Sequence, residues 1–240
     1  MTFSRTLVLA FAVVLSGFAI GSGFARARTA DRYVTVKGVA ERTVRADLAI
    51  WPLRLVAADD DLSRAHAKLE NDVRRVRQFL ASQGIDTAHI ALQDFSVTDA
   101  RANQYGGPVQ AGSRFVIRQT IMVRSTDPDQ VLRASQRVGD LVAAGVVLSS
   151  GGEYGPGGGP TFIFTNLNEI KPPMIAEATS RAREAADQFA RDSRTSLAGI
   201  RRASQGIFEI LPRDQAPGIM EQSQIEKTVR VVSTVEYALK

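Results

Sequence analysis

The order of strand-like and helix-like patterns constrains the fold of this 240-residue chain more than any single motif. Strand patterns cover residues 33–58, 90–99, 114–124, 146–148, 161–164, 207–211 and 228–239. Helical spacing of apolar residues covers residues 62–80 and, further along, 168–197. This order predicts two β-α-β-β units, at about residues 33–124 and 146–239, joined by a short helix. Because hairpins join consecutive strands, we expect an α+β fold of mostly antiparallel sheet with helices packed on it.

The first strand pattern reads as one long extended segment that ends near Ala58. Residues 48–57 are apolar on both faces, which is typical of a strand covered on both sides. Pro52 removes one backbone donor from this segment, so we expect an edge strand or a bulged strand there. Lys37-Gly38 indicates another bulge. The change of apolar positions from Ile90 and Leu92 to Phe95 and Val97 indicates a bulge in the strand pattern 90–99 as well.

Acidic residues and glycines indicate where the helices begin and end. Asp59-Asp60-Asp61 precede the first helical pattern, and Gly84 follows it. Because the spacing of a calcium-binding loop is absent, we expect these carboxylates to cap the helix. The connecting helix is expected to begin at Asp127-Pro128 and to end near Gly145, with Val131, Ser135, Val138 and Val142 buried.

The last helical pattern, which begins at Asn168 and Pro172, is rich in alanine. Small side chains let a helix lie close to a sheet. The expected buried stripe consists of Ile175, Ala178, Ala182, Ala185, Phe189, Ser193 and Leu197.

An uncharged apolar segment, residues 7–24, lies near the amino terminus and follows Arg5. Ala25-Arg26-Ala27 matches the small-residue pattern of a signal-peptidase site. As a helix, residues 7–24 would rise about 27 Å, just short of a ~30 Å hydrocarbon core. Residues 1–27 are therefore expected to be a signal peptide or a signal-anchor helix, and both alternatives stay open. In either case residues 31–240 are expected in the periplasm, free or anchored to the inner membrane.

The charge balance argues against nucleic acid as a partner. The whole chain has a net charge of +5, which falls by two to +3 without Arg5 and Arg26 of the leader segment. Such a small positive net charge would give only weak electrostatic attraction to the phosphate backbone of a nucleic acid. We expect no nucleic-acid partner.

Residue types that commonly act in catalysis or bind metal ions are scarce in this chain. The chain has no cysteine, and its two histidines, His66 and His89, are far apart in sequence. We expect both histidines to be ordinary, partly buried residues. The glycine-rich loop 151–160 leads into a strand and lacks the pattern of a phosphate-binding loop. Trp51 and Tyr33 are expected to pack in the core or on a sheet face. We therefore expect no catalytic, metal or cofactor site, and we expect that the protein is not an enzyme.

Four segments carry a resemblance to a known family: YVTVKGVAERTVRADLAIWPLRL from Tyr33, IAEATSRAREAADQF from Ile175, LAGI from Leu197, and the closing VRVVSTVEYAL. Together they resemble the SIMPL domain family of bacterial envelope proteins over about residues 31–240. The family includes a periplasmic immunogenic protein and an oxidative-stress-associated relative. The resemblance implies an exported α+β domain, a link to stress defence and, in some members, ring-like or channel-like oligomers. It implies no catalytic residues.

Two hypotheses for function remain open at this point. The first is a non-enzymatic envelope protein that acts through self-assembly or binding of an envelope partner, with the strand 228–239 pairing at an exposed sheet edge. The second is a periplasmic carrier or sensor of a small ligand, with a groove between the two units gated by the 151–160 loop.

Overall fold

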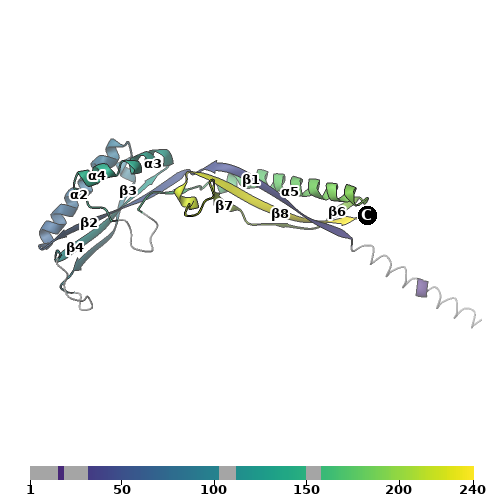
Figure 1. Ribbon diagram of the computed structural model, residues 1–240, viewed down its shortest axis with the longest axis horizontal. Coiled ribbons are helices and arrows are strands. Elements are labelled where there is room, and N and C mark those ends of the chain that lie inside the picture. Colours follow the sequence, from purple (N-terminus) through teal and green to yellow (C-terminus); the bar gives the residue numbers. More distant parts are fainter. Residues whose placement is uncertain (1–15, 19–31, 103–111, 150–157) are drawn as a thin grey trace, which may run out of the picture. The chain divides into compact units, whose positions relative to one another are not determined.

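The structure is a computed structural model that describes residues 16–18, 32–102, 112–149 and 158–240 (Figure 1). Its strands and helices confirm a mixed α+β fold with antiparallel sheets. The strands are β1 (Tyr33–Arg45), β2 (Leu48–Asp59), β3 (Ile90–Asp99), β4 (Phe115–Ser125), β5 (Thr161–Ile163), β6 (Leu197–Gln205), β7 (Glu209–Pro212) and β8 (Glu226–Leu239). The helices are α2 (Leu62–Ser82), α3 (Pro128–Gln136), α4 (Gly139–Ala143) and α5 (Leu167–Asp192), with short 3₁₀ turns at Thr87–His89 and Glu221–Ser223.

The chain forms two compact units, each assembled from separate segments. One contains residues 1–42, 168–209 and 229–240, and the other contains residues 43–167 and 210–228. The β-α-β-β order is not confirmed, because the elements run β-β-α-β-β and later β-α-β-β-β along the chain. The two compact units also differ from the expected units, which were the continuous segments 33–124 and 146–239.

A break between β1 and β2 explains the different grouping. The expected single extended segment ends at Arg45 and resumes at Leu48, and its two parts join different sheets. At the break, the carboxylate of Asp47 accepts hydrogen bonds from the backbone N–H groups of Thr165 (2.9 Å) and Asn166 (3.2 Å). An aspartate that binds backbone groups in this way offers the chain an alternative to the strand ladder.

The sheet of the unit formed by residues 43–167 and 210–228 has the order β3-β4-β2-β5. Helices α2, α3 and α4 lie along this sheet (Figure 1). The apolar stripe of α2 is buried against β2 and β4, as the spacing predicted, through Ala65, Leu69, Val76 and Leu80. Trp51 on β2 is 1% exposed and lies in this core, as expected.

Pro52 lies inside the sheet, and the register of β2 with β4 is continuous through it, so neither the edge strand nor the bulged strand expected at Pro52 is found. One side of β2 pairs with β4, whereas the other side has two short partners, β5 at residues 48–50 and residues 147–149 at Arg54 and Val56. Backbone groups of alternate residues point to the same side of a strand. The nitrogen of Pro52, which carries no hydrogen, therefore faces the same side as the backbone groups of Arg54 and Val56, away from β4.

The ends of α2 are confirmed, but the connecting helix is not continuous. Gly84 follows α2 with φ +78, a left-handed conformation that favours glycine. Asp127 caps α3 by accepting from the backbone N–H of Gln130 at 3.0 Å. The expected helix up to Gly145 is interrupted between α3 and α4, and Val142, expected to be buried, is 58% exposed. Leu141 is buried instead, because the break rotates the second helix relative to the expected stripe.

In the unit formed by residues 1–42, 168–209 and 229–240, α5 packs along a sheet of order β1-β8-β6, with β7 also paired to β8. The buried stripe of α5 differs from the expected one, since Phe189 is 53% exposed. Ala178 and Ala182 are buried as expected, and the buried stripe continues at every fourth residue through Met174, Ala186 and Ala190. A row of alanines brings the helix backbone close to the sheet.

Two strand expectations in this unit are corrected. Residues 197–205 form β6, although Leu197 was expected on the helix stripe. The strand β8 alternates buried and half-buried residues as expected, but it lies between β1 and β6. The expectation that residues 228–239 form an exposed edge is therefore wrong.

Candidate functional site

Helix α2 leaves the outer strand of its sheet uncovered. The helix packs on β2 and β4, and β3 is the strand beyond β4. On the α2 face of β3, Leu92, Phe95 and Val97 are 43%, 54% and 45% exposed. Sequence reasoning expected these side chains on a strand but did not identify them as a surface. We call these three side chains the β3 face.

A bulge in β3 creates this face. The pairing with β4 shifts between Gln93 and Ser96, as the change of apolar positions predicted, and Asp94 has φ +53. Without the extra residue, side chains would alternate from Leu92 to Asp94 and Ser96. With it, Val97 lies opposite Ile117 just as Leu92 lies opposite Ile121. The bulge therefore directs apolar residues, rather than polar ones, toward the α2 side.

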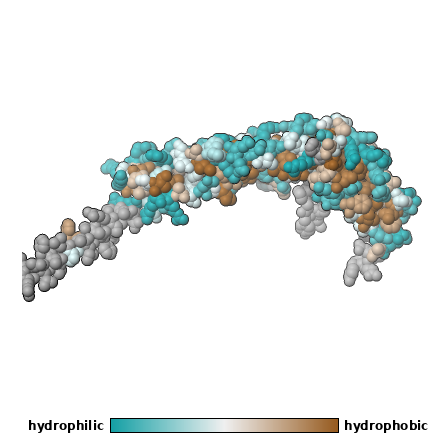
Figure 2. All heavy atoms as spheres, turned by 180° about the vertical axis from the view of Figure 1, so that it is seen from behind, coloured by the Kyte–Doolittle hydropathy of each residue, from teal (hydrophilic) through white to brown (hydrophobic). Residues whose placement is uncertain are grey.

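Two adjoining clefts lie along the β3 face, between it and α2, and we call them together the β3 groove. One has a volume of about 850 Å³, and Phe95, Val97, Phe115 and Ile117 contribute most of its apolar lining. The other, of about 450 Å³, is lined by Leu92 and Phe95 and by residues of α2. His66 and Phe95 line both clefts. Apolar surface is gathered over the unit that contains β3 (Figure 2).

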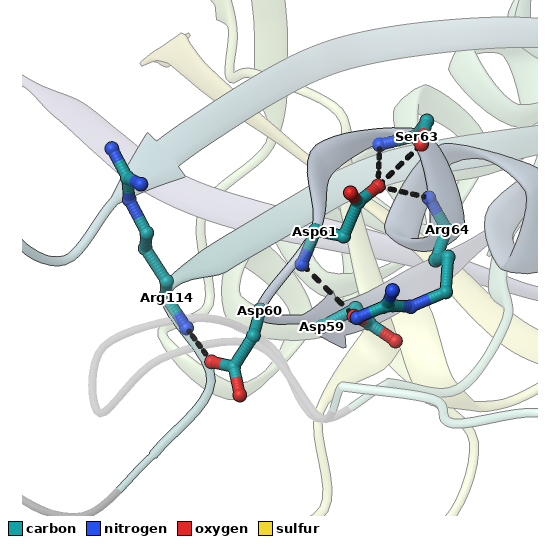
Figure 3. Close-up of polar contacts among 6 residues, drawn as sticks. All are labelled: Asp59, Asp60, Asp61, Ser63, Arg64 and Arg114. Carbon is teal, nitrogen blue, oxygen red and sulfur yellow. Dashed lines mark hydrogen bonds and ion pairs between the residues drawn. The ribbon is translucent and has the colours of Figure 1, made fainter.

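The three aspartates that precede α2 lie at one end of the groove, where Asp60 and Asp61 line the larger cleft. Figure 3 shows the polar contacts of these aspartates. Asp59 accepts from the Arg64 guanidinium at 2.7 Å, and Asp60 accepts from the backbone N–H of Arg114 at 2.9 Å. Asp61 accepts from the backbone N–H groups of Ser63 and Arg64, which confirms the predicted cap. Each carboxylate thus has a structural partner.

Hydrogen bonds at this end also lower the pKa values of three aspartates. The Arg64 guanidinium holds the pKa of Asp59 below its usual value, and the Ser63 hydroxyl and backbone hydrogen bonds do the same to the pKa of Asp61. The Arg114 guanidinium binds both carboxylate oxygens of Asp99 and lowers the pKa of Asp99. It also lies 4.6 Å from the centre of the Phe115 ring. Asp59 and Asp99 are thus neutralised locally by arginine partners at this end of the groove.

The other end of the groove has a different electrostatic character. Arg74 and Arg77 of α2 line the smaller cleft together with Glu70. All three are exposed, and within the described part of the chain none of them forms an ion pair. This end therefore carries two guanidinium groups and one carboxylate, a net charge of +1, beside an apolar strand.

The remaining residues that the sequence singled out are scattered. His66 is exposed at the groove, although it was expected to be partly buried, and His89 ends the 3₁₀ turn before β3. Tyr33 is half-exposed beneath the Arg201 guanidinium at 4.8 Å. Most of the 151–160 loop, residues 151–157, lies outside the described residues. Within the described ranges, no three acidic or histidine side chains converge to hold a metal ion.

Of residues 1–27, the structure describes only residues 16–18, which are helical. Among the residues that the structure describes, no helix is long and apolar enough to cross a membrane.

Comparison with known proteins identifies one family, over most of the chain. No curated protein matches the chain. The family model SIMPL, described as a protein of unknown function (DUF541), matches residues 34–237. The match includes both units and all the residues of the β3 groove, and the chain therefore belongs to the SIMPL family.

Proposed function

We propose that the protein is an exported, non-enzymatic envelope protein that acts by associating with another protein chain through the β3 face. The other chain is either a second copy or an envelope partner. The observation that carries the proposal is the β3 face itself, three large apolar side chains that a bulge directs into a groove where they stay about half-exposed. Contiguous exposed apolar surface beside polar residues is typical of interaction sites.

Export is proposed from the apolar residues 7–24 and the Ala25-Arg26-Ala27 pattern. The protein would then act in the periplasm, either free or anchored to the inner membrane. A role in stress defence follows from the family resemblance alone. The absence of cysteine and of a recognisable catalytic motif supports a binding role over catalysis.

Association through a sheet edge is less well supported than association through the β3 face. Beside β8, the edge strand β6 has two irregularities in its pairing, between Leu197 and Arg202. It also carries Arg201 and Arg202 in succession. Bulges and charged side chains are features that protect edge strands from pairing with other chains. The edge of β6 is therefore poorly suited to pairing with another chain.

The proposal is tested by measuring the size of complexes formed by the full chain in envelope extracts. We expect the wild type to elute in a complex larger than the monomer, and Phe95→Ser or Val97→Ser to shift it toward the monomer. Ser96→Ala is the matched control, because Ser96 lies next to Phe95 but opposite Arg118 on the other sheet face. A wild type that is monomeric at high concentration and retains no protein partner would overturn the proposal.

A second candidate is the binding of a small apolar ligand. The larger cleft, at about 850 Å³, falls within the range of ligand pockets. None of the described residues of the 151–160 loop lines it, so this candidate differs from the gated groove expected from the sequence. Ligand-induced thermal stabilisation that is lost in Phe95→Ser would favour this candidate, and no shift across a metabolite panel would remove it.

A further inference from the structure

We infer that the β3 groove receives an amphipathic helix of a partner protein, whose apolar stripe covers the β3 face and whose acidic side chains meet Arg74 and Arg77. This inference rests on the proposed function and narrows its partner to one class. Three properties of the groove favour this occupant: the strand spacing, the exposure of its floor and its charge.

The spacing of the sheet leaves room for a helix beside α2. Neighbouring strands lie about 4.8 Å apart, and packed helices lie about 8–10 Å apart. A helix placed next to α2 is therefore displaced by about two strands. Since α2 packs on β2 and β4, the next helix position on the same face lies over β3 and its outer edge. The β3 face supplies the apolar contact that such a helix needs.

The openness of the groove favours a helix over a small molecule. Small-ligand pockets typically bury about 70–90% of the ligand surface. The floor of this groove is open enough that Phe95 remains 54% exposed. An amphipathic helix suits an open groove, because only its apolar stripe needs to be covered while its polar face stays in water.

The charges favour an acidic helix supplied by another protein. Arg74, Arg77 and Glu70 line this end of the groove, and none of them has an ion pair among the described residues. The net charge there is +1, so acidic side chains on the incoming helix would be complementary. A second copy is a weaker occupant, since α2 and α5 already bury their apolar stripes within their own units.

The test uses the full chain and three fluorescent 18-residue peptides. One has leucines at i, i+3, i+4 and i+7 spacing with flanking glutamates, one has lysines in place of the glutamates, and one is a scramble of the first. We expect the acidic amphipathic peptide to bind at least about tenfold more tightly than the other two. Phe95→Ser and Val97→Ser should each abolish binding, and Ser96→Ala should leave it unchanged. Arg74→Glu combined with Arg77→Glu should reverse the preference to the lysine peptide.

The inference is overturned if the scrambled peptide binds equally well, if Phe95→Ser binds like the wild type, or if no peptide binds. It is also overturned if palmitate saturates the groove in a Phe95-dependent manner while the peptides do not bind. Complexes in envelope extracts separate this inference from the proposed function. If those complexes depend on Phe95 but no amphipathic peptide binds, the helix is the wrong occupant and protein association stands.

Discussion

Gly38 in β1 lies directly against the backbone of Ala178 in α5. A Cβ atom at Gly38 would stand 1.8 Å from the Ala178 carbonyl oxygen and 2.5 Å from the backbone nitrogen of Ala182. No side chain fits in this space, and backbone atoms cannot move aside as a flexible side chain can. Glycine at this position and alanine along α5 therefore serve the same end, which is close packing of helix on sheet.

This contact predicts that Gly38→Ala is strongly destabilising. The methyl group has to push α5 away from the sheet, so we expect the free energy of unfolding to fall by about 3 kcal/mol. Denaturant unfolding of the full chain measures the change. Gly199→Ala is the matched control, because a Cβ at Gly199 in β6 meets no atom within 4 Å. Equal stability of the two variants would contradict the packing described here.

Acidification is expected to weaken the end of the fold held by Asp59, Asp61 and Asp99. Their pKa values in the folded protein lie below the ordinary value of 3.8, because arginine and backbone hydrogen bonds favour the ionised carboxylates. Their stabilising contribution is therefore fully present above pH 3.8 and is lost as the pH falls through the lower folded values. Unfolding measured from pH 6 to pH 2 should show this loss. Asp59→Asn should make the loss smaller, and an unchanged pH profile in that variant would refute the role of the Asp59–Arg64 pair.

Asp72 is expected to show the opposite pH dependence. It is 2% exposed, and burial raises its pKa above the ordinary value, although Arg75 and Lys68 oppose the shift. The contribution of Asp72 to stability is therefore greatest below pH 3.8 and is lost as the pH rises through the folded value. We expect Asp72→Asn to melt at a higher temperature than the wild type at pH 7 and to lose this advantage at pH 2.5. A lower melting temperature at pH 7 would show that the ionised carboxylate is needed by its neighbours.

The bulge in β3 predicts a backbone effect at Asp94. Its φ of +53 is a left-handed conformation that glycine adopts freely and that a β-branched residue resists. We expect Asp94→Gly to raise the free energy of unfolding by roughly 0.5–1 kcal/mol, and Asp94→Val to lower it by about 1–2 kcal/mol. Chemical denaturation distinguishes the two signs. If valine is tolerated as well as glycine, the bulge does not depend on the conformation of Asp94.

The local elements could be predicted from the sequence because their signals are local. Spacing, a capping aspartate and a closing glycine determined α2, and a change of apolar positions revealed the bulge in β3. The partners of each strand could not be predicted, because residues 33–58 look like one strand until the contacts of Asp47 divide them. Lys227 is another case, since a lysine in a strand pattern gives no sign that it is fully buried with Glu221 as its partner.

The β3 face is a feature that the sequence could not establish. Leu92, Phe95 and Val97 look like ordinary core residues of a strand. Whether they are core or surface depends on how far α2 extends across the sheet, and that is decided by packing on β2 and β4. Sequence periodicity contains no information on that extent.

The central claim, that another protein covers the β3 face, is tested most directly by photo-crosslinking in cells of the source organism. The photoreactive residue benzoylphenylalanine replaces Phe95 in one strain and Ser96, on the other face of the sheet, in the control strain. The account predicts discrete protein adducts from position 95 and none from position 96. Adducts of equal yield at both positions, or no protein adduct at position 95, would contradict it.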